Sequence, residues 1–206
     1  MDSVSRTPGR PRGVARTQRE RLLAAAVEVL TQERAGQFTL AQVARAARVT
    51  PALAHYYFTD REGLLEALLG ERVAPLIDDV VAAARMRAGQ PQHALTFLMQ
   101  RATSLLASHL LLRRCVWLPQ PAAVRLRERL RGCLHELLVR GQEIGALRAD
   151  LTPDYLADAL LGLVLLPYLD EPQAQVAGER VTQLMLQHVA LLRDGIVRAD
   201  KSPSGH

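Results

Sequence analysis

Residues 39–62, TLAQVARAARVTPALAHYYFTDRE, decide the fold of this 206-residue chain. Thr39 stands before a run of apolar residues, and Gln42 follows it by three positions, which is the pattern of a capping box at a helix start. One helical face is formed by Leu40, Val43, Ala44 and Ala47, which recur at the i, i+3, i+4 and i+7 positions. The pattern predicts a helix that begins near Leu40 and buries this face.

A second helix is predicted after a very short turn. Thr50 is suited to cap it, and Pro51 suits its first position because proline there loses no hydrogen bond and already has a helical φ. The 100° spacing of a helix places Ala52 and Tyr56 outward with His55 on the flank, opposite Ala54, Tyr57 and Phe58. A small residue lets a helix approach the floor of a major groove, and Tyr and His supply hydrogen bonds to phosphates or base edges. These properties indicate a recognition helix for DNA.

A third helix is predicted to begin at Thr59, which forms another capping-box pattern with Glu62. Asp60 and Glu62 complement the positive end of the helix dipole, whereas Arg61 in the same turn opposes it. A phosphate contact would explain a cation at this position.

Residues 49–69, VTPALAHYYFTDREGLLEALL, are similar to the signature of the TetR family of bacterial one-component transcription regulators. The resemblance runs from about residue 17 to residue 69. It implies an all-α fold with a three-helix DNA-binding head, which contains a helix-turn-helix, and a larger helical body for dimerisation and effector binding. By position, it assigns DNA contacts to Thr39, Gln42, Thr50, Pro51, Ala52, Leu53, His55, Tyr56 and Arg61.

Three residues depart from the usual family pattern. Arg48 stands where the family usually has Gly, at a helix end that often needs a positive φ, so we expect strain of about 1 kcal/mol there. His55 replaces a commoner Tyr, which leaves the base preference open. Arg61 replaces the usual Lys and keeps the charge while changing the geometry of any phosphate contact.

The composition favours helices throughout. The chain is 49% hydrophobic, which supports a sizeable core, and only 4% aromatic, with Ala, Leu and Arg prominent. Two cysteines are too few for a disulfide scaffold, and the sequence shows no signal peptide and no apolar run of about 18 residues. We therefore expect a cytoplasmic protein.

The charge is concentrated near the N-terminus. The chain carries a net charge of +5, and residues 1–61 hold ten Arg against five acids, so the rest of the chain is neutral overall. This asymmetry is typical of a protein in which one end meets a polyanion. A membrane surface is the less suitable partner, because the apolar residues of the head are needed for its own core.

The sequence predicts four regions. Residues 1–16 form a flexible basic arm, residues 17–62 a helix-turn-helix DNA-binding domain, residues 63–194 an effector-binding and dimerisation domain, and residues 195–206 a flexible tail. A connecting helix over about residues 59–85 joins head to body, and Pro75 is expected to bend it because proline removes a backbone hydrogen bond. The alternative is that Pro75 marks a break between two separate helices.

The arm has two interpretations. Arg10, Arg12 and Arg16 are candidates for contacts with a minor groove, because the Gly9-Arg10-Pro11 sequence resembles the core of an AT-hook. The alternative, which we favour, is a solvated leader that adds only general attraction to phosphate.

The body is predicted to contain amphipathic helices over residues 92–114, 122–142, 155–168 and 174–193. The third of these, which Thr152 and Pro153 introduce, is apolar nearly all round and must be covered on every side, so we predict a homodimer. Its interface residues are predicted to be Leu160, Val164, Val181, Leu184, Met185 and His188.

A small-molecule pocket is predicted in the body. Candidate lining residues are Phe97, Met99, Leu106, His109, Trp117 and Tyr168. Plain core packing is the alternative for each apolar residue at this spacing, and satisfied core or interface positions are the alternative for His109 and His188.

Motifs for catalysis are missing from the sequence. We find no phosphate loop, CxxC pair, HExxH or GxSxG, so we expect neither an enzyme nor a metal or cofactor site. The predicted function is a transcription repressor that a small apolar or amphipathic effector releases from an inverted-repeat DNA operator. Two alternatives remain: a constitutive DNA-binding protein without effector, against which about 140 residues beyond the head argue, and a redox-responsive regulator that uses Cys115 and Cys133.

Overall fold

The computed structural model describes residues 12–32 and 38–165, together with Gln183, Gln187, Ala190, Gly195 and Ile196. All regular structure in this part of the chain is helical, which confirms the all-α prediction. The chain divides into two compact units, Met1–Leu68 and Leu69–His206. No helix of the described part is both long and apolar enough to cross a membrane.

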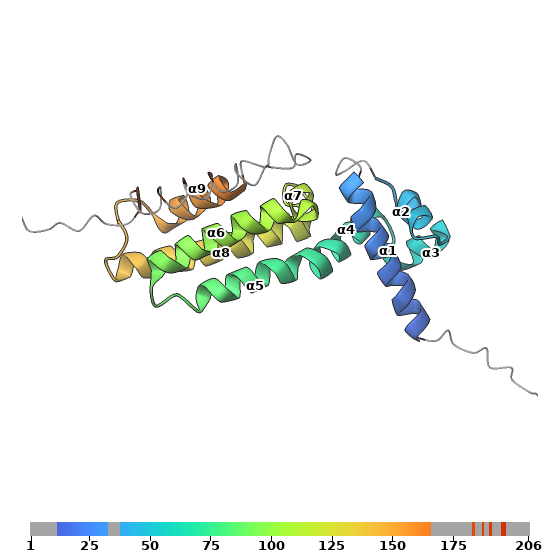
Figure 1. The fold of residues 1–206 in the computed structure, drawn as a ribbon, viewed down its shortest axis with the longest axis horizontal. Helices are drawn as coiled ribbons and strands as arrows, with labels where there is room; N and C mark the ends of the chain where they lie inside the picture. The colour runs from blue at the N-terminus through green and yellow to red at the C-terminus, as the bar shows by residue number, and fades with distance from the viewer. Residues whose placement is uncertain are drawn as a thin grey trace, which may run out of the picture. The chain divides into compact units, whose positions relative to one another are not determined.

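The first unit contains four helices, α1 (Arg12–Gln32), α2 (Leu40–Ala46), α3 (Pro51–Phe58) and α4 (Arg61–Leu68) (Figure 1). Helix α1 packs against α2 and α4, while α3 packs against α2 and α4. Their shared core is made of Leu22, Leu23, Ala26, Leu30, Phe38, Leu40, Val43, Ala44, Ala54, Phe58, Leu64, Leu65 and Leu68. The apolar periodicity of α2 and α3 therefore predicted their buried faces correctly.

Helix α1 begins earlier than predicted. It starts at Arg12, so the backbone of Arg12 and Arg16 belongs to a helix and not to a flexible arm. After Pro11, Gly13 is the only poor helix former before Thr17, and a single Gly in a first turn costs only about 1 kcal/mol. Arg10 lies outside the described residues.

The start of α2 confirms the predicted capping box. The Gln42 amide donates to the Thr39 hydroxyl at 3.2 Å, and the Thr39 amide donates to the Gln42 side-chain oxygen at 2.6 Å. At the other end of α2, Arg48 has a φ of 55°, which is the left-handed conformation expected from a position where Gly is usual. The α3 cap is also as predicted, because the Leu53 amide donates to the Thr50 hydroxyl at 3.3 Å and Pro51 opens the helix.

The prediction that the third predicted helix begins at Thr59 is wrong. Thr59 ends α3 with a φ of 60°, and Asp60 caps α4 by accepting a hydrogen bond from the Gly63 amide at 2.7 Å. A Cβ on Gly63 would lie 2.3 Å from the Phe58 carbonyl oxygen. Gly63 therefore permits the close approach that brings α4 directly behind α3, and the shorter Asp60 side chain caps from the position that this tight turn leaves.

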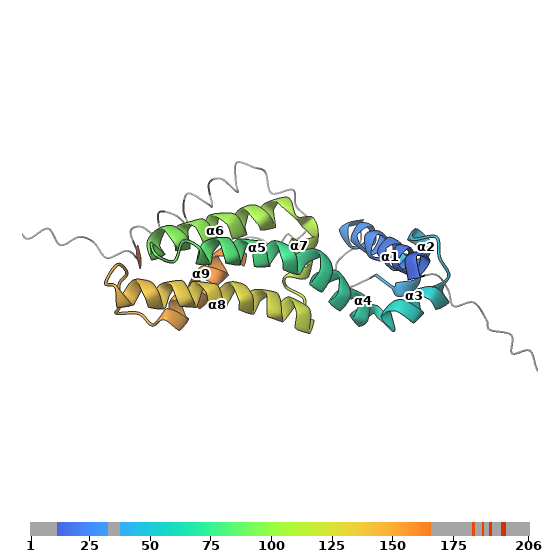
Figure 2. The ribbon, with the colours of Figure 1, turned by 90° about the horizontal axis from the view of Figure 1, so that it is seen from below.

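The second unit contains a π-helix, η1 (Leu69–Val73), followed by α5 (Ala74–Arg85), α6 (Pro91–Ser108), α7 (Leu110–Cys115), α8 (Pro121–Glu143) and α9 (Pro153–Leu165). Helices α5, α6 and α8 pack against one another, and α9 lies along α8 and α6 (Figures 1 and 2). Three arginines form four pairs with carboxylates that connect α8 to its neighbours: Arg85 with Glu136, Arg129 with Asp78, and Arg131 with both Asp154 and Asp158.

The region predicted as one connecting helix, residues 59–85, is divided into three helical segments in the structure. Helix α4 ends at Leu68, η1 occupies the next five residues, and α5 starts one residue before Pro75. Proline has no amide hydrogen, and its ring clashes with the carbonyl four residues earlier, so the backbone widens into a π-turn upstream instead of simply bending. Pro75 thus marks the irregularity, as predicted, but the form of the irregularity differs.

The predicted helix over residues 92–114 is interrupted at His109. Helix α6 ends at Ser108, and His109 adopts an extended conformation with a φ of −113° and a ψ of 95° before α7 begins. Within α7, the Arg113 guanidinium donates to the Ala107 carbonyl at 2.7 Å and holds the short helix against the end of α6. His109 is exposed, so its predicted place on an apolar face is wrong.

Helix α9 begins as predicted, with Pro153 in its first position and the Thr152 hydroxyl accepting from the Tyr155 amide at 3.3 Å. Leu160 and Val164 are 1% and 2% exposed in the core of the single chain, which corrects the expectation that a second copy covers them. Sequence periodicity identified them as buried without showing which partner, α8 or a second chain, buries them.

The beginning of the predicted tail is held in place. Ile196 is buried against the body core, and its carbonyl accepts from the Arg148 amide at 3.0 Å. The Arg148 side chain also donates to the Gly195 carbonyl at 3.0 Å. Several predicted residues lie outside the described part of the chain: Tyr168, Val181, Leu184, Met185 and His188.

The strain at Arg48 leads to a testable prediction. We expect Arg48→Gly to raise the free energy of unfolding by about 0.5–1 kcal/mol, because Gly adopts the left-handed conformation without steric cost. The matched control is Arg45→Gly, the same change at an exposed position inside α2, which we expect to lower stability by about 1 kcal/mol. Urea unfolding of the full chain measures both, and equal effects of the two changes would contradict strain at Arg48.

Candidate nucleic-acid interface

The predicted DNA-contacting residues gather at the N-terminal ends of α2 and α4 and along the outward side of α3. Thr39 and Gln42 form the cap of α2, and Arg61 is the first residue of α4. Thr50, Pro51, Ala52, His55 and Tyr56 are all exposed, and Leu53 is half-buried. Ala54 and Phe58, on the opposite side of α3, are 0% and 4% exposed. One face of α3 is thus fixed in the core and the other is open to a ligand.

Tyr56 is the most prominent group on this surface. Its side chain is 78% exposed, although large aromatic residues normally contribute to cores. The Tyr57 ring supports it from behind in an edge-to-face arrangement, with 5.2 Å between ring centroids. An exposed aromatic side chain with a polar tip and a rigid support is suited to binding a flat or polar partner.

His55 has a defined orientation. Its Nδ1 lies 2.7 Å from the Thr59 carbonyl oxygen, which requires Nδ1 to carry the proton and donate. The neutral ring then presents Nε2 as a hydrogen-bond acceptor toward solvent. An acceptor suits an amino group of a base edge better than a phosphate oxygen.

Arg61 is partly held by the protein itself. Its guanidinium carbon lies 5.4 Å from the centroid of the Phe38 ring, and its side chain is 32% exposed. This cation-π contact gives a structural reason for the cation that the sequence did not reveal. The exposed part of the guanidinium remains at the surface beside the start of α4.

The electrostatics of the surface favour an anion. Between Thr39 and Thr59 the sequence has no Asp or Glu, and its charged side chains are Arg45 and Arg48, both exposed. Sequence comparison with the family pattern marked Arg48 as an irregular backbone position but missed that both residues add positive charge next to α3. Arg21 stabilises the arrangement from within, since its guanidinium donates to the Ala47 carbonyl at 2.7 Å.

The first unit matches a known family. Residues 22–68 match the model described as bacterial regulatory proteins, tetR family. The matched region contains the two capped helices, the turn at Arg48 and α4. The first unit carries a DNA-binding domain of the TetR family.

One curated relative is similar over part of the chain. The HTH-type transcriptional regulator BetI of Rhizobium meliloti (strain 1021) is 38% identical over 76 residues, which are 37% of this chain and 37% of BetI. The chain thus matches only about a third of the length of that relative.

Solved structures show that the whole fold is shared. NalD, the secondary repressor of the MexAB-OprM multidrug efflux pump in Pseudomonas aeruginosa, is similar with a TM-score of 0.69 and 20% identity, over 89% of this chain and 98% of NalD. The regulator FadR from Bacillus subtilis, in complex with stearoyl-CoA, gives a TM-score of 0.65 and 17% identity, over 84% of this chain and 96% of FadR. At these identities the likeness shows a shared fold alone.

In the body, the residues predicted to line an effector pocket do not share one environment. Met99 and Leu106 are 1% and 2% exposed in the core, as plain packing residues are. Phe97 is half-buried, with the Arg87 guanidinium carbon 4.0 Å from its ring centroid. Trp117 is half-buried and packs at the edge of the core.

The two cysteines are unsuited to redox sensing. Cys115 and Cys133 are both free and 0% exposed. Burial raises the pKa of the Cys115 thiol to about 12 and that of Cys133 to about 11. Because the thiolate is the reactive form and is favoured only by exposed, electropositive surroundings, both cysteines serve as packing residues. Among the described residues, no three His, Cys, Asp or Glu side chains gather closely enough to hold a metal ion.

The cysteine environments lead to the next prediction. A pH of 8 is below the raised pKa values of both thiols, so both stay protonated. A disulfide reagent such as DTNB should therefore label the native chain only as fast as it unfolds. Urea should make both thiols react at once. Rapid labelling of the native chain, accompanied by a loss of DNA binding, would restore the redox alternative.

Proposed function

We propose that this protein is a ligand-responsive transcription repressor, which binds an inverted-repeat operator as a homodimer and is released by a small effector. Recognition is assigned to α3, and the caps of α2 and α4 provide contacts to the DNA backbone. The TetR-family domain of the first unit supports regulation of transcription as the general activity. The operator and the sign of regulation belong to the proposal.

The observation that carries this proposal is the outward face of α3. It combines a small residue, Ala52, with the exposed Tyr56 and the oriented His55, and no acidic residue lies between Thr39 and Thr59. A helix with this face enters a major groove without steric obstruction, and its polar tips reach base edges. The capped N-termini of α2 and α3 present the positive ends of their dipoles to phosphates.

Dimerisation follows from the geometry of two-fold DNA sites. Two recognition helices related by a two-fold axis meet half-sites about one helical turn apart, which is how helix-turn-helix dimers read inverted repeats. Leu160 and Val164 are buried in the core of the single chain, so we place the proposed dimer interface on the exposed side of α9. That side carries Tyr155, Ala159 and Gly162. Ala159 and Gly162 are small and permit close approach of a second helix.

Effector control is supported by the helical body. NalD and FadR, which share the fold, are a repressor and a regulator solved with stearoyl-CoA, respectively. In this chain the helical backbone runs from Arg61 through η1 to Arg85, so a ligand that alters η1 or α5 acts on residues joined covalently to α4. A coupling free energy of about 1–3 kcal/mol is sufficient for a 5- to 150-fold change in DNA affinity.

Substitutions in the head test the assignment of base and phosphate contacts. We expect Tyr56→Ala to weaken binding by about tenfold on a duplex selected from a random library, and much less on a shuffled duplex. We expect Arg61→Ala to weaken binding to both duplexes and to lower the salt slope by about one contact per subunit.

Fluorescence anisotropy at several salt concentrations measures these affinities. Arg101→Ala, an exposed change on α6, is the matched control and should leave both affinities unchanged. If Tyr56→Ala weakened binding equally on the two duplexes, Tyr56 would have no role in base recognition.

Sedimentation tests the dimer. We expect the wild type to be dimeric at micromolar concentration, and Ala159→Arg to weaken dimerisation at least tenfold while the helix content stays the same. Met86→Arg, at a residue that is 80% exposed at the end of α5, is the control that adds the same charge elsewhere. A monomeric wild type would contradict the dimer, and dimers unchanged by Ala159→Arg would place the interface elsewhere.

A further inference from the structure

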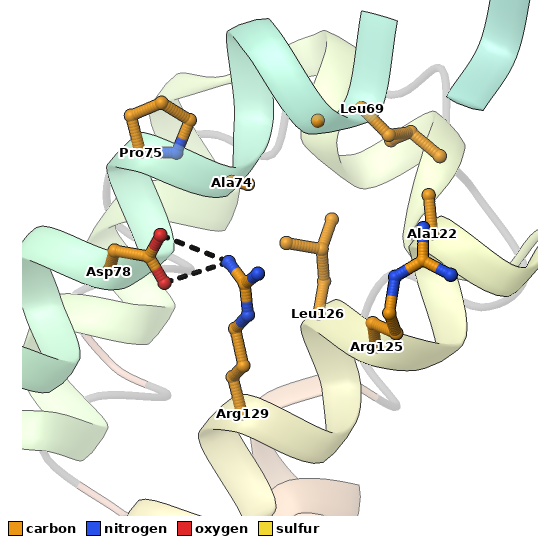
Figure 3. A pocket seen from close by; sticks show the side chains of 9 residues that line it. Leu69, Ala74, Pro75, Asp78, Ala122, Arg125, Leu126 and Arg129 are labelled. Carbon is orange, nitrogen blue, oxygen red and sulfur yellow. Dashed lines mark hydrogen bonds and ion pairs between the residues drawn. The ribbon is translucent and has the colours of Figure 1, made fainter. Parts of the chain in front are cut away.

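A surface groove in the second unit lies between η1, the start of α5 and the start of α8 (Figure 3). Its volume is about 190 Å³. The lining residues are Leu69, Gly70, Ala74, Pro75, Asp78, Ala122, Arg125, Leu126 and Arg129. All of them belong to one compact unit, so the groove is defined by the packing of the body alone.

The groove has an apolar floor and a charged rim. Leu69, Leu126 and Ala122 are 0%, 3% and 4% exposed and form the floor. Figure 3 shows Leu126 between the side chains of Arg129 and Arg125, both of which are exposed. Binding sites for amphipathic molecules combine an apolar surface with a few polar groups in this way.

One of the arginines already binds a carboxylate. The Arg129 guanidinium donates to the two oxygens of Asp78 at 2.8 and 3.0 Å, as the dashed lines in Figure 3 show. The partners of this pair are 43% and 56% exposed, so water screens it and it contributes little to stability. A carboxylate on a ligand is thus able to compete with Asp78 for Arg129.

The start of α8 adds a second source of positive potential. Ala122 lies in the first turn of α8, and this turn contains no acidic residue. Gln120, at the N-cap position, forms no side-chain capping bond. The positive end of the helix dipole lies beside the arginines of the rim and favours an anion in the groove.

We infer that this groove binds a small organic carboxylate and is an effector site of the proposed repressor. The carboxylate pairs with Arg129, and its hydrocarbon part lies over the apolar floor beside Leu126. The volume corresponds to about six water molecules, which suits a single-ring or short-chain acid better than a long lipid. This inference rests on the proposed function and specifies the chemical class of the effector.

The site is placed to act on the helix that leads to the head. Leu69 and Gly70 belong to η1, whereas the arginines belong to α8, so a bound ligand links the π-turn to the body. π-turns are uncommon, are maintained against a competing α-helical arrangement and often occur at functional sites. A ligand that favours one arrangement of η1 thereby changes the helix that continues, through Leu68, into the DNA-binding unit.

Binding is measured first with the full chain and two simple acids, benzoate and hexanoate. Amide signals of Gly70 and Ala122 should shift in NMR titrations, with dissociation constants of about 1 mM or below. Benzyl alcohol and hexanol test the charge, and inorganic phosphate tests the apolar part. Each should bind at least tenfold more weakly than the acids.

Three variants locate the site. Arg129→Gln should weaken binding about tenfold, whereas Arg140→Gln, on the same helix and 60% exposed beside Glu143, should leave it unchanged. Asp78→Asn should strengthen binding severalfold, because it removes the competing carboxylate. Gly70→Phe should abolish binding with the fold intact, since a side chain begun at Gly70 meets no atom within 4 Å.

The effector role is tested by the DNA affinity of the wild type, measured on the selected duplex with and without saturating acid. We expect the acid to weaken DNA binding at least fivefold and Arg129→Gln to remove this response. Equal binding of acids and alcohols, or equal effects of Arg129→Gln and Arg140→Gln, would overturn the site. Acid binding that leaves the DNA affinity unchanged would overturn the effector role. Failure to bind any duplex without acid would instead overturn the proposed function, while the acid titrations still decide the groove.

Discussion

The backbone amides at the starts of α2 and α3 need hydrogen-bond partners, and the rest of the head depends on how Thr39 and Thr50 supply them. A turn of only residues 47–50 joins the helices, so their angle is set by one left-handed residue, Arg48, and by the Thr50 cap. With this angle fixed, the apolar sides of both helices meet the core from α1 and α4. The opposite side of α3 is then necessarily exposed, and it carries the groups that suit a DNA groove.

The body depends on a different constraint, which is the missing amide hydrogen of Pro75. The helix that leaves the head cannot continue as a regular α-helix past this residue, and a π-turn of five residues accommodates it. The turn leaves Gly70 facing open space and Leu69 on the floor of a groove. The same irregularity that interrupts the connecting helix therefore provides both a groove and a π-turn, a feature that often occurs at functional sites.

Local sequence patterns predicted where helices begin and which faces are buried better than they predicted which residues or chains those faces contact. The Thr39-Gln42 box and the Thr50-Pro51 start are defined by residues within one turn, so the sequence alone located them. The Asp60 cap depends on the close packing of Gly63 against Phe58, which no local pattern contains. Leu160 was correctly predicted to be buried, but an apolar helix looks the same whether its own chain or a second copy covers it. The groove was missed because its residues, from Leu69 to Arg129, are distant in sequence and individually ordinary.

The central claim is that the cap residues and the outward face of α3 form the DNA-binding surface. The most direct test is residue-resolved amide hydrogen exchange of the full chain, with and without a selected duplex. We expect DNA to slow exchange and shift signals at residues 39–42, 50–56 and 61, while the core of the body around α5, α6 and α8 changes far less. Protection confined to residues 69–165, with residues 39–61 unchanged, would contradict it.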